Sequence, residues 1–294
     1  MGKLETVSIP ASVKTIGTNP FYGMDIDVLL SDANTAFELQ DGLLYDKAQK
    51  RLVSCPSKVA RDITIKNGTE TIGAYAFSYR MAEDTGETWH ISVPNSVKEI
   101  GDYAFHRNYS MTCDIPASIR RIGVCAYAEC TRIDNDLVFG GGVVIGDGAF
   151  SSSFETHFGV TGLTIVGEGG AIIGKFAFGN CRGFMTVTIT EGESYIGDVA
   201  FLNSGLQEVT LAEGLVSIGD DVFYGCGNLY GSSLVLPKSL EHIGGLYNSQ
   251  EKEYDKELDF YRTTWICTMN IYVIEGSYAE QFCKENEIPY QYSH

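Results

Sequence analysis

The chain has 294 residues, 44% of them hydrophobic and 20% charged, which is the composition of a folded protein with a sizeable core. Lys and Arg number 21 against 38 Asp and Glu, so the formal net charge is −17, and this charge repels the phosphate backbone of a nucleic acid. No run of residues approaches the roughly 18 apolar residues of a membrane-spanning helix. The composition therefore argues against nucleic acid as a partner and against a membrane span in this chain.

Residues 1–17 are expected to form a partial N-terminal repeat. Val7-Ser8-Ile9 has the apolar–polar–apolar alternation of a half-buried strand, and Ile16-Gly17 is the first of a series of Ile-Gly pairs. Because residues 4–9 already have the repeat pattern, we expect the natural protein to begin earlier and any export signal to lie outside the sequence given.

Residues 18–60 interrupt the repeat and are expected to form a β-hairpin insertion. The stretches 37–46 and 51–55 flank a polar gap, Asp46–Lys50. Two apolar runs joined by a short polar segment are typical of a hairpin. The hairpin is expected either to project from the fold or to replace one of the repeats.

Residues 61–245 consist of regular repeats marked by Ile-Gly pairs. Successive pairs lie 22 to 28 residues apart, a spacing typical of one coil in a repeat protein. The isoleucines of these pairs are Ile72, Ile100, Ile122, Ile145, Ile173, Ile196, Ile218 and Ile243. A recurring period of this length predicts a solenoid, in which each coil stacks on the previous one.

A small residue and an aromatic residue follow each of these pairs except the last. The aromatic residues are Phe77, Phe105, Tyr127, Phe150, Phe178, Phe201 and Phe223. Stacked at strand spacing, their rings would form a ladder inside the solenoid, and burial of each would contribute about 1.5–3 kcal/mol. Apolar–polar–apolar triplets such as Ile63-Thr64-Ile65 and Val187-Thr188-Ile189 lie upstream of the Ile-Gly pairs and predict strands.

These motifs resemble the repeat of the BspA-like leucine-rich repeat family. The unit of that family reads roughly L-x-x-V-x-I-P-x-S-V-x-x-I-G-x-x-A-F-x-x-C-x-x-L, and residues 91–105, 115–130 and 206–229 follow it most closely. The resemblance covers most of residues 4–245. It implies a mainly β repeat solenoid, a right-handed leucine-rich-repeat superhelix with a parallel β-sheet, used for protein recognition on bacterial surfaces, including adhesion to host proteins.

An insertion follows the last Ile-Gly pair, where the Ala-Phe pair is missing. Residues 248–262 are charged, and Tyr254, Leu258 and Tyr261 lie at helical spacing. We expect a loop or a short helix in this segment.

The chain is expected to end in a strand and a capping helix within residues 246–294. Ile271-Tyr272-Val273 predicts the last strand. Ser277 and Glu280 have the spacing of a capping box, which predicts a helix over about 277–286. Such a helix would cap the open end of the solenoid, so we treat 1–294 as a single leucine-rich repeat domain.

The cysteines are expected to be structural. None of the eight belongs to a C-x-x-C pair, and Cys130, Cys181 and Cys226 each follow a ladder aromatic by three residues, which favours small buried thiols. A disulfide among Cys113, Cys125 and Cys130 and a metal site stay open as alternatives.

The sequence contains no motif typical of an enzyme. The five histidines form no H-x-x-x-H or H-E-x-x-H pattern, and there is no nucleophile elbow or phosphate-binding loop. Asp25, Asp27 and Asp32, or Asp134 to Asp136, could offer oxygen ligands to calcium, but neither group matches an EF-hand loop. We expect no catalytic residues, no metal and no cofactor.

The outward residues of the triplets form a candidate binding surface on the concave face of the solenoid. They are mostly short hydroxyl side chains, with polar neighbours on the same strands. The candidates are Ser92, Asp114, Thr164, Thr188 and Thr210, with His90 and Glu208 beside them. Extended concave faces bind partners in solenoid proteins. The alternative is that Thr and Ser merely suit exposed strand positions and stack on one another.

The C-terminal insertion supplies a second set of candidates, the aromatic residues Tyr254, Tyr261 and Trp265. An exposed aromatic patch larger than a few hundred Å² would indicate an interaction site, because monomers rarely leave one uncovered.

The preferred function is a non-enzymatic protein-interaction or adhesion module of a bacterial cell-surface or secreted protein. Its expected partner is another protein, with host extracellular-matrix and surface proteins as candidates, and the chain is expected to be a monomer. The alternatives are a structural spacer, which predicts no binding patch, and a glycan-binding module, which requires exposed aromatic residues.

Overall fold

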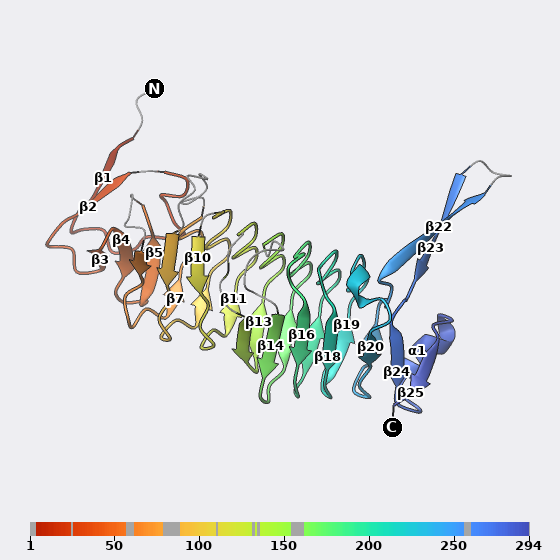
Figure 1. Ribbon diagram of the computed structural model, residues 1–294. Coiled ribbons are helices and arrows are strands. Elements are labelled where there is room, and N and C mark those ends of the chain that lie inside the picture. The colour runs from red at the N-terminus through yellow and green to blue at the C-terminus, as the bar shows by residue number, and fades with distance from the viewer. Residues whose placement is uncertain are drawn as a thin grey trace.

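The computed structural model describes residues 4–24, 26–56, 62–78, 89–109, 111–130, 133, 136–153, 162–255 and 260–293, with only the backbone considered at 250–255 and 260–265. The fold is a parallel β-solenoid whose coils follow one another along a single axis (Figure 1). The predicted fold class is confirmed.

One side of the solenoid is a continuous sheet of eleven strands. From β5 onward its strands pair in parallel, and each later strand ends on the isoleucine of an Ile-Gly pair. Its strands are β3 (Phe37–Gln40), β4 (Leu43–Asp46), β5 (Arg51–Ser54), β7 (Thr71–Ile72), β9 (Glu99–Ile100), β11 (Arg121–Ile122), β13 (Val143–Ile145), β15 (Ala171–Ile173), β17 (Ser194–Ile196), β19 (Leu215–Ile218) and β21 (His242–Ile243).

The triplet strands form three shorter parallel sheets instead of one long one. The first holds β6 (Asp62–Thr64), β8 (Trp89–Ser92) and β10 (Met111–Asp114), and the second holds β12 (Leu137–Gly140), β14 (Gly162–Val166), β16 (Thr186–Ile189) and β18 (Glu208–Leu211). The third holds β20 (Ser233–Val235), β24 (Asn270–Val273) and β25 (Tyr290–Tyr292). A separate parallel pair, β1 (Thr6–Ile9) and β2 (Asp27–Leu30), lies at the N-terminal end (Figure 1).

The predicted aromatic ladder runs through the core. Rings in neighbouring coils lie nearly parallel, with centroids 4.8 Å apart between Phe105 and Tyr127 and 6.3 Å apart between Phe201 and Phe223. All seven side chains are 0% exposed. Because each ring packs on the ring of the next coil, the ladder joins the coils as well as filling them.

The Ile-Gly glycines allow close approach between the backbones of neighbouring coils. A Cβ placed on Gly101 would lie 2.5 Å from the backbone nitrogen of Ala74 in the preceding coil. Gly101 does not have a positive φ, so the requirement at this position is space.

A buried polar column runs beside the aromatic ladder, three residues after each ring from Phe105 to Phe223. Cys130 Sγ donates to the carbonyl of Phe105 at 2.9 Å, and Cys181 Sγ donates to that of Phe150 at 3.0 Å. Ser153, at the same repeat position, donates its hydroxyl to the carbonyl of Tyr127. Cys and Ser can therefore take the same repeat position, because the side chains of Cys130, Cys181 and Ser153 each donate to a carbonyl of the preceding coil.

The buried thiols of this column are held protonated. Burial raises the pKa of Cys130 and Cys181 to about 12 and that of Cys226 to about 11. None of the eight cysteines forms a disulfide, so the structure does not contain the alternative bond among Cys113, Cys125 and Cys130.

The predicted N-terminal hairpin is part of the long sheet. β4 and β5 pair antiparallel across residues 47–50, and β3 adds a third antiparallel strand. Leu43 and Leu52 pack into the main core, whereas Leu44 and Val53 pack into a smaller core with β1 and β2. The apolar runs of this region therefore arise because both faces of the strands are buried.

The prediction of a loop or short helix at residues 248–262 is wrong for 249–255 and 260–262, and residues 256–259, with Leu258, lie outside the described residues. The segment begins a long antiparallel hairpin, β22 (Ser249–Asp255) and β23 (Phe260–Ile266), which projects away from the solenoid (Figure 1). β23 is rich in aromatic and β-branched residues, which favour strands, and this preference outweighs the helical spacing of the three apolar positions.

The predicted last strand and capping helix are confirmed. β24 contains residues 271–273, and α1 (Tyr278–Glu285) follows it. A short 3-10 helix, η1 (Gly227–Leu229), lies earlier in the chain, between β19 and β20. The hydroxyl of Ser277 accepts from the backbone N–H of Glu280 at 3.2 Å, and the carboxylate of Glu280 accepts from the N–H of Gly276 at 2.7 Å. No helix in the described part of the chain is long and apolar enough to span a membrane.

Candidate functional site

The triplet residues predicted to bind a partner fall on two separate sheets. Thr164, Thr188 and Thr210 lie directly beside one another on β14, β16 and β18. Ser92 pairs with Asp114 on the first sheet. Since these sheets are not hydrogen-bonded to each other, the predicted single column is divided into two patches.

The polar neighbours bond mainly to adjacent strands. His90 Nδ1 lies 2.9 Å from Thr112 Oγ1, and His90 Nε2 lies 3.7 Å from Asp114 Oδ2. Glu208 is exposed and pairs with Thr186 in register. These contacts between strands are compatible with the purely structural alternative for the triplet surface.

The aromatic candidates of the C-terminal insertion lie on the projecting hairpin. Tyr254 of β22 pairs with Tyr261 of β23, and Trp265 pairs with Gln250 nearer the solenoid. The structure therefore places these three residues together on one hairpin, away from the triplet candidates (Figure 1).

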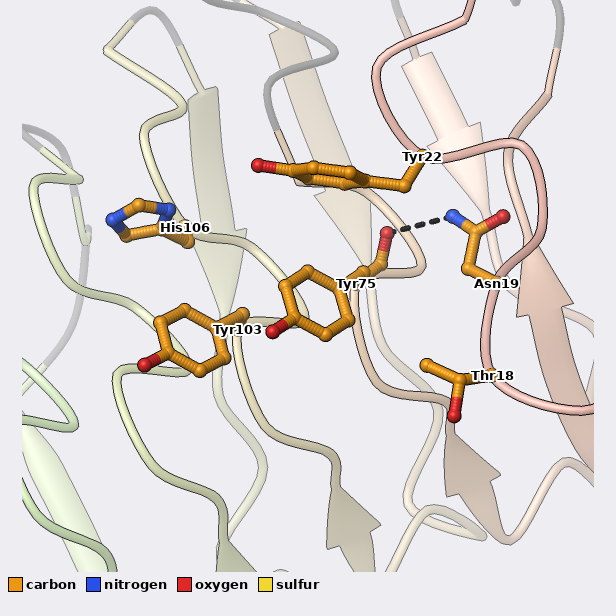
Figure 2. Close-up of a pocket in the computed structure, with 6 residues that line it drawn as sticks. All are labelled: Thr18, Asn19, Tyr22, Tyr75, Tyr103 and His106. Carbon is orange, nitrogen blue, oxygen red and sulfur yellow. Dashed lines mark hydrogen bonds between the residues drawn. The ribbon is translucent and has the colours of Figure 1, made fainter.

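A groove that the sequence did not predict lies at the N-terminal end of the solenoid. It is open, has a volume of about 450 Å³, and is lined by Thr18, Asn19, Tyr22, Tyr75, Tyr103 and His106. We call it the tyrosine groove. Figure 2 shows that its side chains come from the segment before β2 and from the turns of two successive coils.

The aromatic rings of the tyrosine groove contact one another in series. The rings of Tyr75 and Tyr103 are stacked with centroids 5.0 Å apart and an interplanar angle of 4°. Tyr22 meets Tyr75 at 5.0 Å and 64°, and His106 meets Tyr103 at 5.4 Å and 87°. Tyr22 is the most exposed of them, with 42% of its surface accessible.

The turns hold the two stacked tyrosines in place. Tyr75 and Tyr103 have φ values of 58° and 56°, in the left-handed region. The N–H of Tyr75 donates to the carbonyl of Asp102 at 3.0 Å, and the N–H of Tyr103 donates to that of Val124 at 2.8 Å. These bonds link each turn to the next coil, so the two rings are built on a hydrogen-bonded scaffold.

Asn19 fixes the third tyrosine. Its side-chain Nδ2 donates to the backbone carbonyl of Tyr75 at 2.8 Å (Figure 2). Its Oδ1 accepts from the N–H of Phe21 at 2.9 Å. Phe21 is buried in the small N-terminal core. The bonds of Asn19 thus hold Tyr22 against Tyr75 of the first regular coil, although the two tyrosines lie 53 positions apart in the sequence.

The groove is polar but uncharged near neutral pH. Burial lowers the pKa of His106, although the nearby Glu129 acts in the opposite direction. The cations beside the groove are paired: Arg107 Nε lies 2.9 Å from Glu129 Oε2, and Arg121 lies 3.6 Å from Asp102. The neighbouring Cys125 thiol raises the pKa of Tyr103, so its phenol also stays protonated.

A repeat position gave a signal for two of the six lining residues. Tyr75 and Tyr103 both stand two residues before a ladder aromatic, in Ile-Gly-x-Tyr-Ala-Phe. The signal for Tyr22 is absent from the sequence because the segment around it is irregular, and only the folded chain brings it to Tyr75.

A second groove lies on the long sheet, with a volume of about 500 Å³ and a lining that includes Glu193, Tyr195, Val216 and Glu241. The Tyr195 hydroxyl donates to the Glu193 carboxylate, and Ile172, in register with Tyr195 on the next strand, is 48% exposed. This groove combines acidic and apolar groups but has a single aromatic ring in its lining.

The possible calcium ligands are only partly described. Asp25, Asp134 and Asn135 lie outside the described residues. Within the described ranges, no group of three or more His, Cys, Asp or Glu side chains is placed to hold a metal ion.

The stacked coils and the aromatic ladder define a leucine-rich repeat solenoid. The family described as "BspA type Leucine rich repeat region" matches residues 54–168 and 152–250, with six copies of its repeat. The chain belongs to this family. A comparison with curated proteins gives no match.

Three solved structures are similar to this chain to different degrees. A leucine-rich repeat protein from Eubacterium ventriosum is similar with a TM-score of 0.52 and 20% identity, over 81% of this chain and 57% of that one. The pneumococcal vaccine antigen PcpA gives a TM-score of 0.42 and 16% identity, over 99% of this chain and 56% of that one. A leucine-rich repeat protein from Bacteroides ovatus gives a TM-score of 0.40 and 17% identity, over 70% of this chain and 58% of that one. This chain thus spans less than two thirds of each of these structures.

Proposed function

We propose that this chain is a non-enzymatic protein-interaction module of a bacterial cell-surface or secreted protein, and that it binds its partner at the tyrosine groove. Membership of the BspA type leucine-rich repeat family supports recognition as the general role and the cell surface or exterior as the location. Host extracellular-matrix and surface proteins are the first candidates for the partner.

The observation that carries the proposal is the gathering of tyrosine rings in an open, prebuilt groove. Tyrosine contributes a large contact area at a low cost in side-chain entropy, and it is enriched in the centres of protein interfaces. Because backbone hydrogen bonds and Asn19 already fix the rings, a partner would need to order little of this surface.

The predicted triplet and hairpin surfaces are secondary candidates. The hairpin β22–β23 merits a direct test, because a two-stranded hairpin on its own is marginally stable in water and would gain stability from a partner. A spacer function predicts binding at none of these surfaces, and a glycan-binding function predicts retention of oligosaccharides.

The test is surface plasmon resonance of the full chain against a panel of purified host matrix proteins and a glycan array. The groove variant carries Tyr75→Asp and Tyr103→Asp. Asp221 occupies the equivalent turn position with a φ of 51°, so an aspartate fits the backbone there. A matched control, Tyr230→Asp, changes a tyrosine that is 79% exposed elsewhere, and a second variant lacks residues 249–266.

Saturable binding to a matrix protein that weakens at least tenfold in the groove variant, but not in the control, supports the proposal. Binding that is lost only when residues 249–266 are removed would instead place recognition on the hairpin. No saturable protein binding would favour the spacer, and binding to glycans alone would favour the glycan-binding module.

A further inference from the structure

We propose that the tyrosine groove receives an extended, uncharged, proline-containing segment of the partner in the polyproline II conformation. This inference rests on the proposed function and specifies the chemistry of the segment that the groove binds.

The tyrosine rings present ring edges to the tyrosine groove, and they do not form a flat aromatic surface. Tyr75 and Tyr103 lie parallel at 5.0 Å, so each ring covers one face of the other, while Tyr22 meets Tyr75 at an angle of 64°. Sugar rings generally stack on an open aromatic face, and here the facing sides of the stacked pair are covered. Proline rings can instead pack against ridges formed by ring edges, as in the aromatic-lined grooves that bind proline-rich peptides.

The length of the ridge matches one turn of polyproline II. Tyr22, Tyr75 and Tyr103 are linked by two steps of 5.0 Å, so they span at most about 10 Å. A polyproline II helix has three residues per turn and advances about 9 Å in that turn. Successive prolines on one side of such a helix would therefore meet successive parts of the groove.

The hydrogen-bonding groups are also complementary. A polyproline II segment makes no internal hydrogen bonds, and proline has no N–H, so its backbone offers chiefly carbonyl acceptors. Tyr75 in the groove lining has a phenol hydroxyl, and a phenol can donate to a carbonyl, whereas the hydroxyl of Tyr103 already bonds to Cys125. A tyrosine-lined wall thus suits a backbone that is rich in acceptors.

The charges indicate a neutral segment. All six lining side chains are uncharged near pH 7, since burial lowers the pKa of His106. Of the described cations, Arg107 pairs with Glu129 and Arg121 pairs with Asp102. A charged ligand would lose hydration without gaining an unpaired counter-charge among these groups, whereas a proline-rich segment loses little.

The test uses isothermal titration of the intact chain with an end-blocked nine-residue peptide, three repeats of Pro-Pro-Ala. Two control peptides have the same length: one has every proline replaced by alanine, and the other has glutamate in place of the alanines. Three protein variants are compared with the wild type: Tyr22→Ala, the double variant Tyr75→Phe with Tyr103→Phe, and Tyr230→Phe as the control away from the groove.

We expect the proline peptide to bind and both control peptides to bind at least tenfold more weakly. Tyr22→Ala should weaken binding about tenfold. The loss of the Tyr75 hydroxyl in the double variant should weaken it about fivefold, because a single hydrogen bond contributes modestly. Tyr230→Phe should bind as the wild type does. Circular dichroism and thermal unfolding of each variant check that the solenoid is intact.

The proposal is overturned if the proline and alanine peptides bind alike, or if folded groove variants bind the proline peptide as the wild type does. It is also overturned if a neutral oligosaccharide such as maltotetraose binds the wild type but not Tyr22→Ala, while the peptide does not bind. If the proline peptide does not bind, but the groove variants still bind a matrix protein more weakly than the wild type, only this inference is contradicted. If the groove variants change neither peptide binding nor matrix-protein binding, the proposed function is contradicted as well.

Discussion

The thiol of Cys181 donates a hydrogen bond to the backbone carbonyl of Phe150, one coil earlier, with Sγ and O 3.0 Å apart and both residues fully buried. The same bond recurs from Cys130 to Phe105 and from Cys226 to Phe201. These thiols therefore link neighbouring coils through hydrogen bonds. The sequence predicts only that they are small buried groups.

Cys181→Ser is expected to be tolerated and Cys181→Ala is not. Serine keeps the donor, as Ser153 does one coil earlier, so the free energy of unfolding should change by less than about 1 kcal/mol. Alanine removes this hydrogen bond, although the backbone N–H of Ser153 still donates to the carbonyl of Phe150 at 3.2 Å, and should cost about 0.5–1.5 kcal/mol more than serine. Urea unfolding of the two variants under reducing conditions measures the difference, and equal losses for serine and alanine would show that the hydrogen bond is unimportant.

The chain is expected to lose stability at alkaline pH because of the same thiols. Their pKa is raised from 9.0 to about 12 in Cys130 and Cys181, so the folded state holds protons that the unfolded state releases. The stabilisation is complete below about pH 9 and is lost as the pH rises from about 9 to about 12. Thermal unfolding at pH 8 to 11 should show a steep fall in Tm.

A triple variant with serine at Cys130, Cys181 and Cys226 provides the control for this pH dependence. Its Tm should fall much less between pH 9 and 11, because serine does not ionise there. A remaining decline at higher pH is expected from Tyr127, whose pKa burial also raises. Superimposable pH profiles for the two proteins would rule out the thiols as the cause.

Glu280 is expected to hold the C-terminal cap in a pH-dependent way. Hydrogen bonds from Lys284, Tyr292 and Gly276 lower its pKa from 4.5 to about 2. A depressed pKa means that the stabilisation is present above about pH 4.5 and is lost as the pH falls toward 2. In Glu280→Gln, amide exchange at Gly276 should be several-fold faster than in the wild type at neutral pH, after correction for intrinsic rates. The two proteins should converge near pH 2, and a constant difference at all pH values would contradict the assignment.

The Ile-Gly glycines differ in what surrounds them, which gives a paired test. Gly101→Ala would place a Cβ 2.5 Å from the backbone of Ala74 and should destabilise the chain by about 1–3 kcal/mol. Gly17→Ala belongs to the same motif but has nothing within 4 Å, so its effect should stay within about 0.5 kcal/mol. Denaturant unfolding compares them, and equal effects would mean that close coil packing does not select glycine.

The repeat architecture could be predicted because its signals recur in every coil. From Ile72 to Ile218, an aromatic residue follows the isoleucine of each Ile-Gly pair by five positions, so every copy indicates the same backbone path and supports the others. Similarly, Ser277 and Glu280 indicated the helix start because capping is a local interaction.

The rest depended on contacts that have no fixed period. The spacing of Tyr254, Leu258 and Tyr261 fits a helix, and only the pairing of β22 with β23 shows that the described residues form strands. The tyrosine groove requires Asn19 to reach the carbonyl of Tyr75, a contact between an irregular segment and the first regular coil. The triplets also do not predict that their strands form separate sheets, because the same triplet pattern occurs on both sides of each point where one sheet ends and the next begins.

The most direct test of the central claim is a hydrogen-exchange footprint of the intact chain with and without a matrix protein that it binds saturably. Binding at the tyrosine groove predicts slower exchange in residues 18–24, in the turns around Tyr75 and Tyr103, and in residues 106–109. It also predicts that this protection disappears with the Tyr75→Asp and Tyr103→Asp variant. Protection confined to β22–β23 or to the triplet sheets, with these segments unchanged, would contradict the claim.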